Sequence, residues 1–154
     1  KVAGTEAGIT EPQTTFSACF GKPFLPLHPT KYAELLGKKL KDNNINVWLI
    51  NTGWSAGAYG TGERIKLAYT RAMISAVLEN KLDHVDFIQD AVFGLQIPVE
   101  CEGVPSDILN PKNTWDDQLA YDEKALHLAT QFAENFKSFV SFADEETIAG
   151  GPLV

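Results

Sequence analysis

A glycine-rich stretch between residues 51 and 65 holds the side chains with the clearest chemical potential. It carries four glycines within ten positions and ends in Glu63-Arg64, followed by Ile65. Glycines let backbone N–H groups approach a ligand closely. A loop at the carboxyl end of a strand is also a common ligand position in α/β proteins. This stretch is therefore the first candidate for a binding site.

Gly57 and Gly62 have the glycine spacing of a phosphate-binding P-loop, in which Lys and then Ser or Thr would come next. Glu63 and Arg64 stand there instead, so a carboxylate would repel phosphate and no hydroxyl is placed to hold Mg²⁺. These residues argue against a triphosphate cradle. Arg64 leaves two interpretations open: a guanidinium that stacks on a base or pairs with a phosphate, or a solvated arginine where a helix starts.

Two flanking segments must position this loop. The continuous apolar run Val47-Trp-Leu-Ile50 predicts a strand over residues 46–52 that is buried on both faces. Apolar residues at helical spacing predict a helix from Lys66 that ends near Asn80. An earlier helix is expected to begin at Pro29, a residue suited to the first helical position, and to end after Asp42. This order of elements favours an α/β fold, with a mixed sheet and packed helices.

Further elements are expected on either side. Residues 16–20 have strand character, and Val92 to Ile97 reads as a strand followed by an irregular connection over residues 98–112. Tyr121 to Phe139 predicts an amphipathic helix whose aromatic face packs onto the sheet. Residues 1–15 are polar and predict a mobile loop. The tail from residue 144 to 154 is expected to be weakly ordered.

Composition bounds the class of protein. The 154 residues make about one domain, and apolar residues at 44 % supply material for a core. A net charge of −7 argues against binding nucleic acid through a basic surface, and the sequence has no apolar run long enough to span a membrane. Cys19 and Cys101 are expected to be reduced, partly buried thiols of a cytoplasmic protein, with a structural disulfide as the alternative. The start lacks an initiator methionine, so we expect a fragment or a processed protein.

No metal site or catalytic set is apparent in the residues alone. The three histidines are far apart in sequence, and Asp83, Asp86 and Asp90 lack the glycine and terminal glutamate of a calcium loop, so they read as a solvated face. His127 is expected at the surface of its helix, and no serine or cysteine has an evident base. The residues alone therefore predict an acidic α/β domain with a glycine-rich loop that is a candidate for ligand binding.

Six short motifs stand in one order along the chain. They are Thr15-Phe-Ser-Ala-Cys-Phe-Gly21, Leu27-His-Pro-Thr-Lys-Tyr-Ala33, Asn51-Thr-Gly-Trp54, Gly60-Thr-Gly-Glu-Arg-Ile65, Thr70-Arg-Ala72 and Asn110-Pro-Lys-Asn-Thr114. On these motifs the sequence closely resembles the C-terminal part of ATP-dependent phosphoenolpyruvate carboxykinases over nearly its whole length.

The resemblance implies a role for the glycine-rich stretch. The family converts oxaloacetate and ATP to phosphoenolpyruvate, ADP and carbon dioxide in gluconeogenesis, using Mg²⁺ and Mn²⁺. Its Arg-Ile pair and a following threonine contact the adenine nucleotide, and they match Arg64, Ile65 and Thr70. Residues 3–15 match a mobile active-site lid. Glu63 departs from the basic residue that family members usually carry, which changes the charge beside the nucleotide.

The resemblance also implies what lies elsewhere. The family's P-loop, its manganese ligands and its oxaloacetate-binding arginine precede the matched segment, so we expect residues 1–154 to be inactive alone and to work with the N-terminal part of the same enzyme. Apolar surface left by the missing part is expected to cause self-association. Two alternatives stay open: a stand-alone, non-catalytic nucleotide-binding or regulatory module, and a structural piece that binds nothing by itself.

Overall fold

The computed structural model describes residues 7–10, 15–16, 22–57 and 60–154. The chain divides into two compact units, one of Lys1–Val47 with Lys137–Asp144 and one of Trp48–Phe136 with Glu145–Val154. The strand expected at residues 16–20 and most of the loop expected at 1–15 lie outside the described residues. The glycine-rich stretch belongs to the second unit.

The first unit is built around helix α1 (Pro29–Asn43), with short 3₁₀ helices η1 (Lys22–Phe24) and η3 (Val140–Phe142). Pro29 begins α1 as predicted, because a first-turn residue needs no N–H partner. Asn44 adopts the left-handed conformation, with φ at 49°, and ends the helix. The ring of His28 packs against Phe139 and Phe142, with centroid separations of 5.8 and 4.4 Å.

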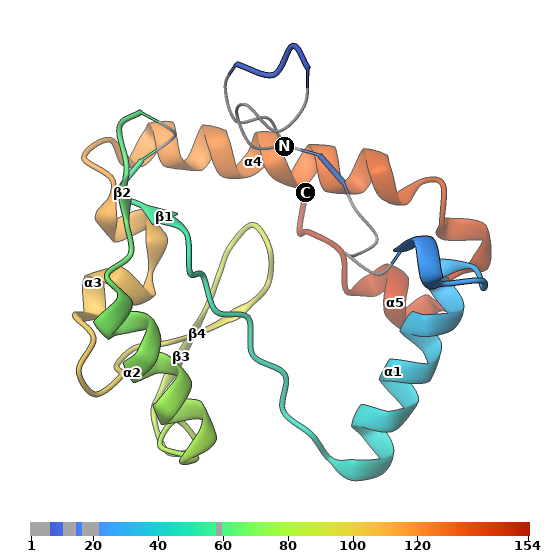
Figure 1. Ribbon diagram of the computed structural model, residues 1–154, viewed down its shortest axis with the longest axis horizontal. Helices are drawn as coiled ribbons and strands as arrows, with labels where there is room; N and C mark the ends of the chain where they lie inside the picture. Colours follow the sequence, from blue (N-terminus) through green and yellow to red (C-terminus); the bar gives the residue numbers. More distant parts are fainter. Residues whose placement is uncertain (1–6, 11–14, 17–21, 58–59) are drawn as a thin grey trace. The chain divides into compact units, whose positions relative to one another are not determined.

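The second unit contains two separate antiparallel hairpins. Strands β1 (Trp54–Ser55) and β2 (Glu63–Arg64) precede helix α2 (Leu67–Leu78), and strands β3 (Phe87–Gln89) and β4 (Gln96–Pro98) follow it (Figure 1). Helices together with small sheets confirm the α/β mixture. The described strands pair only within these hairpins, so the expected mixed sheet does not form among them.

The prediction of a buried strand at residues 46–52 is wrong for this structure. The segment joins no described strand, and the side chains of Val47 and Leu49 are 64 % and 78 % exposed. A strand buried on both faces needs neighbours that pair its N–H and C=O groups and helices that cover its side chains. The described part of the chain provides no paired strand for this segment, so the apolar run stays outside any described sheet, with Val47 and Leu49 exposed and Trp48 and Ile50 half-buried.

The strand expected at Val92–Ile97 is correct only at its end, because the chain first makes a turn. The carboxylate of Asp90 accepts the backbone N–H groups of Val92 and Phe93, and Gly94 takes a positive φ of 69°. This aspartate turn competes with the strand conformation and delays the strand to β4. The connection expected to be irregular holds helix α3 (Ser106–Leu109) and the 3₁₀ helix η2 (Pro111–Thr114).

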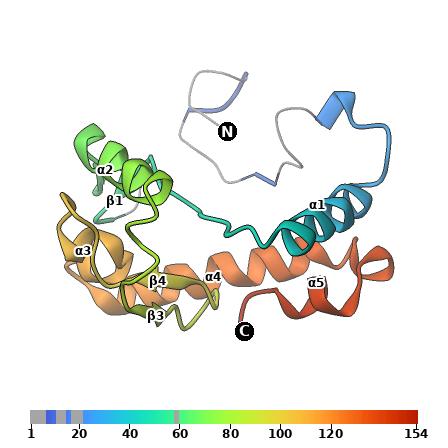
Figure 2. The ribbon, with the colours of Figure 1, turned by 90° about the horizontal axis from the view of Figure 1, so that it is seen from below.

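Helix α4 (Gln118–Phe136) begins three residues earlier and ends three residues earlier than predicted. Asp117 sets the start, because its carboxylate accepts the N–H groups of Leu119 and Ala120. The face of α4 packs on the β3–β4 turn rather than on an open sheet, since Phe132 meets Phe93 edge to face at 6.3 Å. Helix α3 lies toward the amino-terminal end of α4 (Figures 1 and 2), and η2, which follows α3, contacts α4 through the ion pair of Lys112 with Asp122. His127 is exposed, as expected.

The tail contains helix α5 (Glu145–Ala149), after which the N–H of Leu153 donates to the carbonyl of Val92 at 2.7 Å. How strongly residues 144–154 are ordered stays a prediction. The described part of the chain has no helix with the length and apolar character needed to cross a membrane.

The core of the second unit is small. Ala76, Leu82 and the free thiol of Cys101 form its buried cluster, and Ala125 and Ala129 of α4 are also buried. Partly buried side chains surround the cluster: Trp48, Met73, Val77, Val85, Val104 and Leu109. Many large apolar side chains remain outside it, including Leu78 at 76 % exposure. The described part of the chain therefore buries a smaller core than its apolar content of 44 % led us to expect.

Gly62 is predicted to be intolerant of a side chain. A Cβ there would lie 2.6 Å from the carbonyl oxygens of Ser55 and Gly57, both of them backbone atoms that cannot rotate away. We expect Gly62→Ala to lower the free energy of unfolding by on the order of 2 kcal/mol. Chemical denaturation followed by circular dichroism measures the change.

Gly37, inside α1, is the matched control because a Cβ there meets no atom within 4 Å. Gly37→Ala should raise stability by about 0.5 to 1 kcal/mol, since alanine favours a helix interior over glycine. Equal stability of the Gly62→Ala variant and the unsubstituted chain would contradict the packing of the β1–β2 hairpin.

Candidate functional site

The β1–β2 hairpin begins with a turn shaped by Asn51. Its side-chain oxygen accepts the N–H of Gly53 at 2.9 Å, and its side-chain amide donates to the carbonyl of Trp54 at 3.0 Å. The Asn51 side chain therefore bonds one backbone donor and one backbone acceptor of the same turn, as asparagine commonly does. The result fixes the direction in which Trp54 enters β1.

The pairing of the two strands decides which side chains share a face. Trp54 is opposite Arg64, and Ser55 is opposite Glu63. The N–H of Ile65 extends this ladder by donating to the carbonyl of Gly53 at 2.9 Å. Opposed residues of an antiparallel pair project to the same side, and successive residues alternate. Trp54 and Arg64 therefore share one face of the hairpin, and Glu63 belongs to the other.

The glycine-rich loop joins two strands of one hairpin, which differs from the expected link between a buried strand and a helix. Ala56, Gly57 and Gly60 have positive φ values of 63°, 146° and 88°. Only glycine takes such conformations without a steric penalty, so Ala56 is the strained member of the three. Gly57 and Gly60 thus allow the chain to reverse direction between β1 and β2. They would also allow the backbone to approach a ligand closely.

Thr114, at the end of η2, holds the hairpin from a distant part of the sequence. Its hydroxyl oxygen accepts the N–H of Ala56 at 3.0 Å, lies 3.1 Å from the hydroxyl of Ser55, and donates to the carbonyl of Pro111 at 2.7 Å. Sequence reasoning assigned this threonine no role. The sequence signal was limited to Thr114 itself, which ends the motif Asn110-Pro-Lys-Asn-Thr114, because its partners Ser55 and Ala56 lie outside the six motifs.

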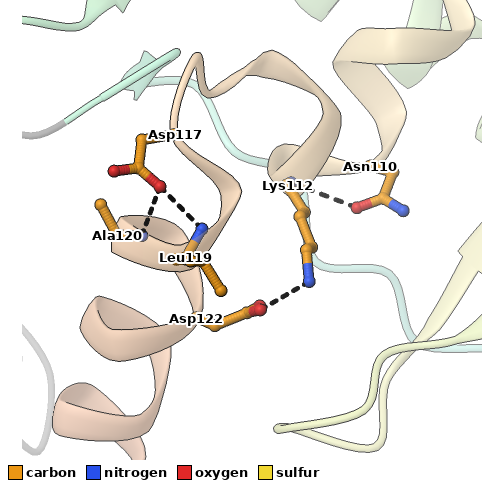
Figure 3. A network of polar contacts seen from close by, with 6 residues as sticks. All are labelled: Asn110, Lys112, Asp117, Leu119, Ala120 and Asp122. Carbon is orange, nitrogen blue, oxygen red and sulfur yellow. Dashed lines mark hydrogen bonds and ion pairs between the residues drawn. The ribbon is translucent and has the colours of Figure 1, made fainter.

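A network of polar contacts fixes η2 in turn (Figure 3). The side chain of Asn110 accepts the N–H of Lys112 at 3.2 Å, and the ammonium of Lys112 pairs with Asp122 of α4 at 2.7 Å. Trp115 stacks edge to face on Tyr121 at 5.6 Å. Burial raises the pKa of the Tyr121 phenol, with the negative charges of Asp90 and Asp122 adding to the rise. Helix α4 therefore supports η2, and η2 in turn contacts the β1–β2 hairpin through Thr114.

The three predicted nucleotide contacts differ in exposure. Arg64 is exposed, Ile65 is half-buried and Thr70 is only 8 % exposed within α2. Arg64 and Ile65 are adjacent at the end of β2, and Thr70 follows on the second turn of α2, where its N–H donates to the carbonyl of Lys66. Trp54, which was not predicted to contribute, is 47 % exposed on the Arg64 face.

The charges around this segment alternate in sign. Glu63 and Arg64 end the hairpin, and Lys66 at the start of α2 lies 5.6 Å from the centre of the Tyr69 ring. An exposed guanidinium beside an exposed indole can stack on or pair with a planar, anionic ligand. Among residues 7–10, 15–16, 22–57 and 60–154, no three His, Cys, Asp or Glu side chains gather as a metal site would require.

These features define a segment of an α/β protein that presents an arginine-bearing hairpin next to a helix. Comparison with known proteins identifies the family. The sequence model of the family described as phosphoenolpyruvate carboxykinase matches residues 1–107. The chain is 62 % identical over 153 residues to the phosphoenolpyruvate carboxykinase (ATP) of Flavobacterium johnsoniae, and 56 % identical over 154 residues to that of Bacillus subtilis.

The chain belongs to the phosphoenolpyruvate carboxykinase family. The match covers 99 % of the chain for the Flavobacterium protein and 100 % for the Bacillus protein, but 29 % of the length of each relative. The resemblance inferred from six motifs is thereby confirmed.

Proposed function

We propose that this chain forms the adenosine side of the ATP site in an ATP-dependent phosphoenolpyruvate carboxykinase. That enzyme converts oxaloacetate and ATP to phosphoenolpyruvate, ADP and carbon dioxide, a step of gluconeogenesis in the cytoplasm. Two observations support the proposal: similarity to relatives whose names carry both the reaction and ATP, and the hairpin that presents Arg64 and Trp54 on one face. The main structural support for the proposal is the pairing of Trp54 with Arg64 on one face of the hairpin.

Each predicted residue has a distinct role in this proposal. Arg64 stacks its exposed guanidinium near the adenine base. The N–H of Ile65 is already bonded to Gly53, so Ile65 contributes its side chain or carbonyl. Thr70 of α2 is buried, so it forms part of the inner wall of the adenosine site rather than its exposed surface.

Glu63 matters less than its charge suggests. It lies opposite Ser55 in the ladder and therefore on the side of the hairpin away from Arg64. Both side chains are exposed, so the high dielectric constant of water weakens the effect of the Glu63 carboxylate on a ligand bound at the Arg64 face. The departure of Glu63 from a basic residue is therefore compatible with adenosine binding at Arg64.

The rest of the site belongs to the rest of the enzyme in this proposal. Residues 1–154 are a segment of the C-terminal nucleotide-binding domain, in which residues 46–52 gain strand neighbours and join a mixed sheet, and residues 1–15 act as a lid. The N-terminal part binds oxaloacetate, the phosphates and the Mg²⁺ and Mn²⁺ ions. No step is assigned to those metals, because the described residues supply no cluster of ligands for them.

The first test is binding of ATP. We expect Arg64→Ala to weaken ATP binding to the 154-residue chain by about tenfold, because the exposed guanidinium is lost from the face that meets the base. Isothermal titration calorimetry measures the dissociation constant. Arg71→Ala removes the chain's other arginine, which is exposed on α2, and should leave binding unchanged.

Glu63→Gln is the complementary variant and should change ATP affinity by less than about twofold, because Glu63 faces away from Arg64. Equal ATP affinity of the Arg64→Ala variant and the unsubstituted chain would rule out the proposed pocket.

The second test is catalysis. We predict that the 154-residue chain releases no phosphoenolpyruvate from oxaloacetate and ATP, because phosphoryl transfer requires a metal and phosphate clamp that we assign to the N-terminal part. A coupled assay for phosphoenolpyruvate, with Mg²⁺ and Mn²⁺ supplied, measures this. Turnover at rates typical of enzymes would show that the assignment is wrong.

The third test concerns exposed apolar surface. Leu49 and Leu78 are 78 % and 76 % exposed, so we expect the chain to self-associate through surface that the rest of the enzyme would cover. Light scattering at increasing concentration should show a rising mean mass, and Leu49→Glu with Leu78→Glu should lower it. A monomer throughout the concentration range would contradict this expectation.

A further inference from the structure

The hydroxyl of Thr114 uses every hydrogen-bonding position it has. A threonine hydroxyl offers one proton and two lone pairs. Its proton goes to the carbonyl of Pro111, and one lone pair accepts the N–H of Ala56. The remaining lone pair faces the hydroxyl of Ser55, which must therefore be the donor in that contact at 3.1 Å. One oxygen thus joins η2 to two consecutive residues of the hairpin.

Ser55 and Ala56 lie where β1 ends and the loop begins, so their contact with Thr114 affects the whole hairpin. Ser55 is the last residue of β1, and Ala56 begins the loop with a positive φ of 63°. Alanine is disfavoured in this conformation, and the hydrogen bond from its N–H to Thr114 offsets part of that cost. On the opposite strand, Ser55 pairs with Glu63, the residue before Arg64.

The contact spans a long stretch of chain and is shielded from solvent. Thr114 is separated from Ala56 by 58 positions, and both hydrogen bonds to the hairpin are partly buried. Loss of the hydroxyl would leave the N–H of Ala56 and the hydroxyl of Ser55 without this acceptor, which costs more than the loss of a solvated hydrogen bond. The end of β1 would then be free to move relative to η2.

We infer that Thr114 is a positioning residue, whose hydroxyl fixes the β1–β2 hairpin on η2 and thereby holds Arg64 in the orientation that meets the nucleotide. The part of this inference that concerns ATP rests on the proposed function. Thr114 itself touches no ligand in this arrangement and acts through Ser55, Ala56 and the strand pairing.

Two substitutions at Thr114 test the inference. Thr114→Val keeps the shape but removes the hydroxyl, and should weaken ATP binding to the 154-residue chain about tenfold. Thr114→Ser retains the hydroxyl and should bind ATP within about twofold of the unsubstituted chain. Thr130→Val is the matched control, because the Thr130 hydroxyl donates to the Leu126 carbonyl within α4, far along the chain from the hairpin, and it should leave ATP affinity unchanged.

A double-mutant cycle between Thr114 and Arg64 distinguishes a positioning role of Thr114 from a purely structural one. If Thr114 acts through Arg64, then adding Thr114→Val to Arg64→Ala should weaken ATP binding far less than Thr114→Val does alone. Independent effects of the two substitutions would overturn the positioning role, as would normal ATP affinity of Thr114→Val. Melting temperatures of all variants report the stability change separately.

Amide hydrogen exchange separates this inference from the proposed function. Thr114→Val should speed the exchange of the Ala56 and Ile65 amides about tenfold, and Thr114→Ser should not. If the unsubstituted chain binds no ATP, the proposed function fails for this chain, and the exchange rates alone decide the inference. Unchanged exchange at both amides would then overturn it, whereas faster exchange confined to Thr114→Val would support a hairpin held by Thr114.

Discussion

The scarcity of buried apolar surface is the constraint on which this structure depends. Three buried residues form the central cluster, and the other buried residues in the described part of the chain are Thr70 and two alanines of α4. Burial of apolar surface is the main favourable term in folding, and the strands are too short to stabilise themselves. Irregular segments of the second unit must therefore be held by other means, and the site is one of these segments.

Short polar side chains provide that means at three places in the second unit. Asn51 closes the turn into β1, Asp90 closes the turn after β3, and Asp117 caps α4. Each places an oxygen two or three residues from the N–H that it accepts, so the interaction is local and forms with little loss of chain entropy. Thr114 differs, because it joins segments 58 positions apart and so connects the hairpin with the base formed by η2 and α4.

The sequence predicted best those elements whose causes are local. Pro29 marked the start of α1, and helical periodicity located α2 and most of α4, because caps and apolar spacing act within a few residues. The strand expected at Val47 to Ile50 depended on partners that no local pattern specifies. Apolar character showed that this segment suits burial, but only a neighbouring strand can satisfy its backbone, and the described chain offers none.

The candidate site shows the same division. Arg64, Ile65 and Thr70 were predicted as nucleotide contacts by resemblance, and this stays a prediction; Glu63 and Arg64, standing where a P-loop has Lys and Ser or Thr, argued against a P-loop. What the sequence could not show was the register of β1 and β2, on which the meaning of Glu63 and Arg64 depends. Because successive residues of a strand face opposite sides, the pairing of Trp54 with Arg64 separates the two charges that the sequence places side by side. The Glu63 carboxylate therefore projects from the face of the hairpin opposite the one that carries Arg64 and Trp54, and this arrangement requires a fixed register.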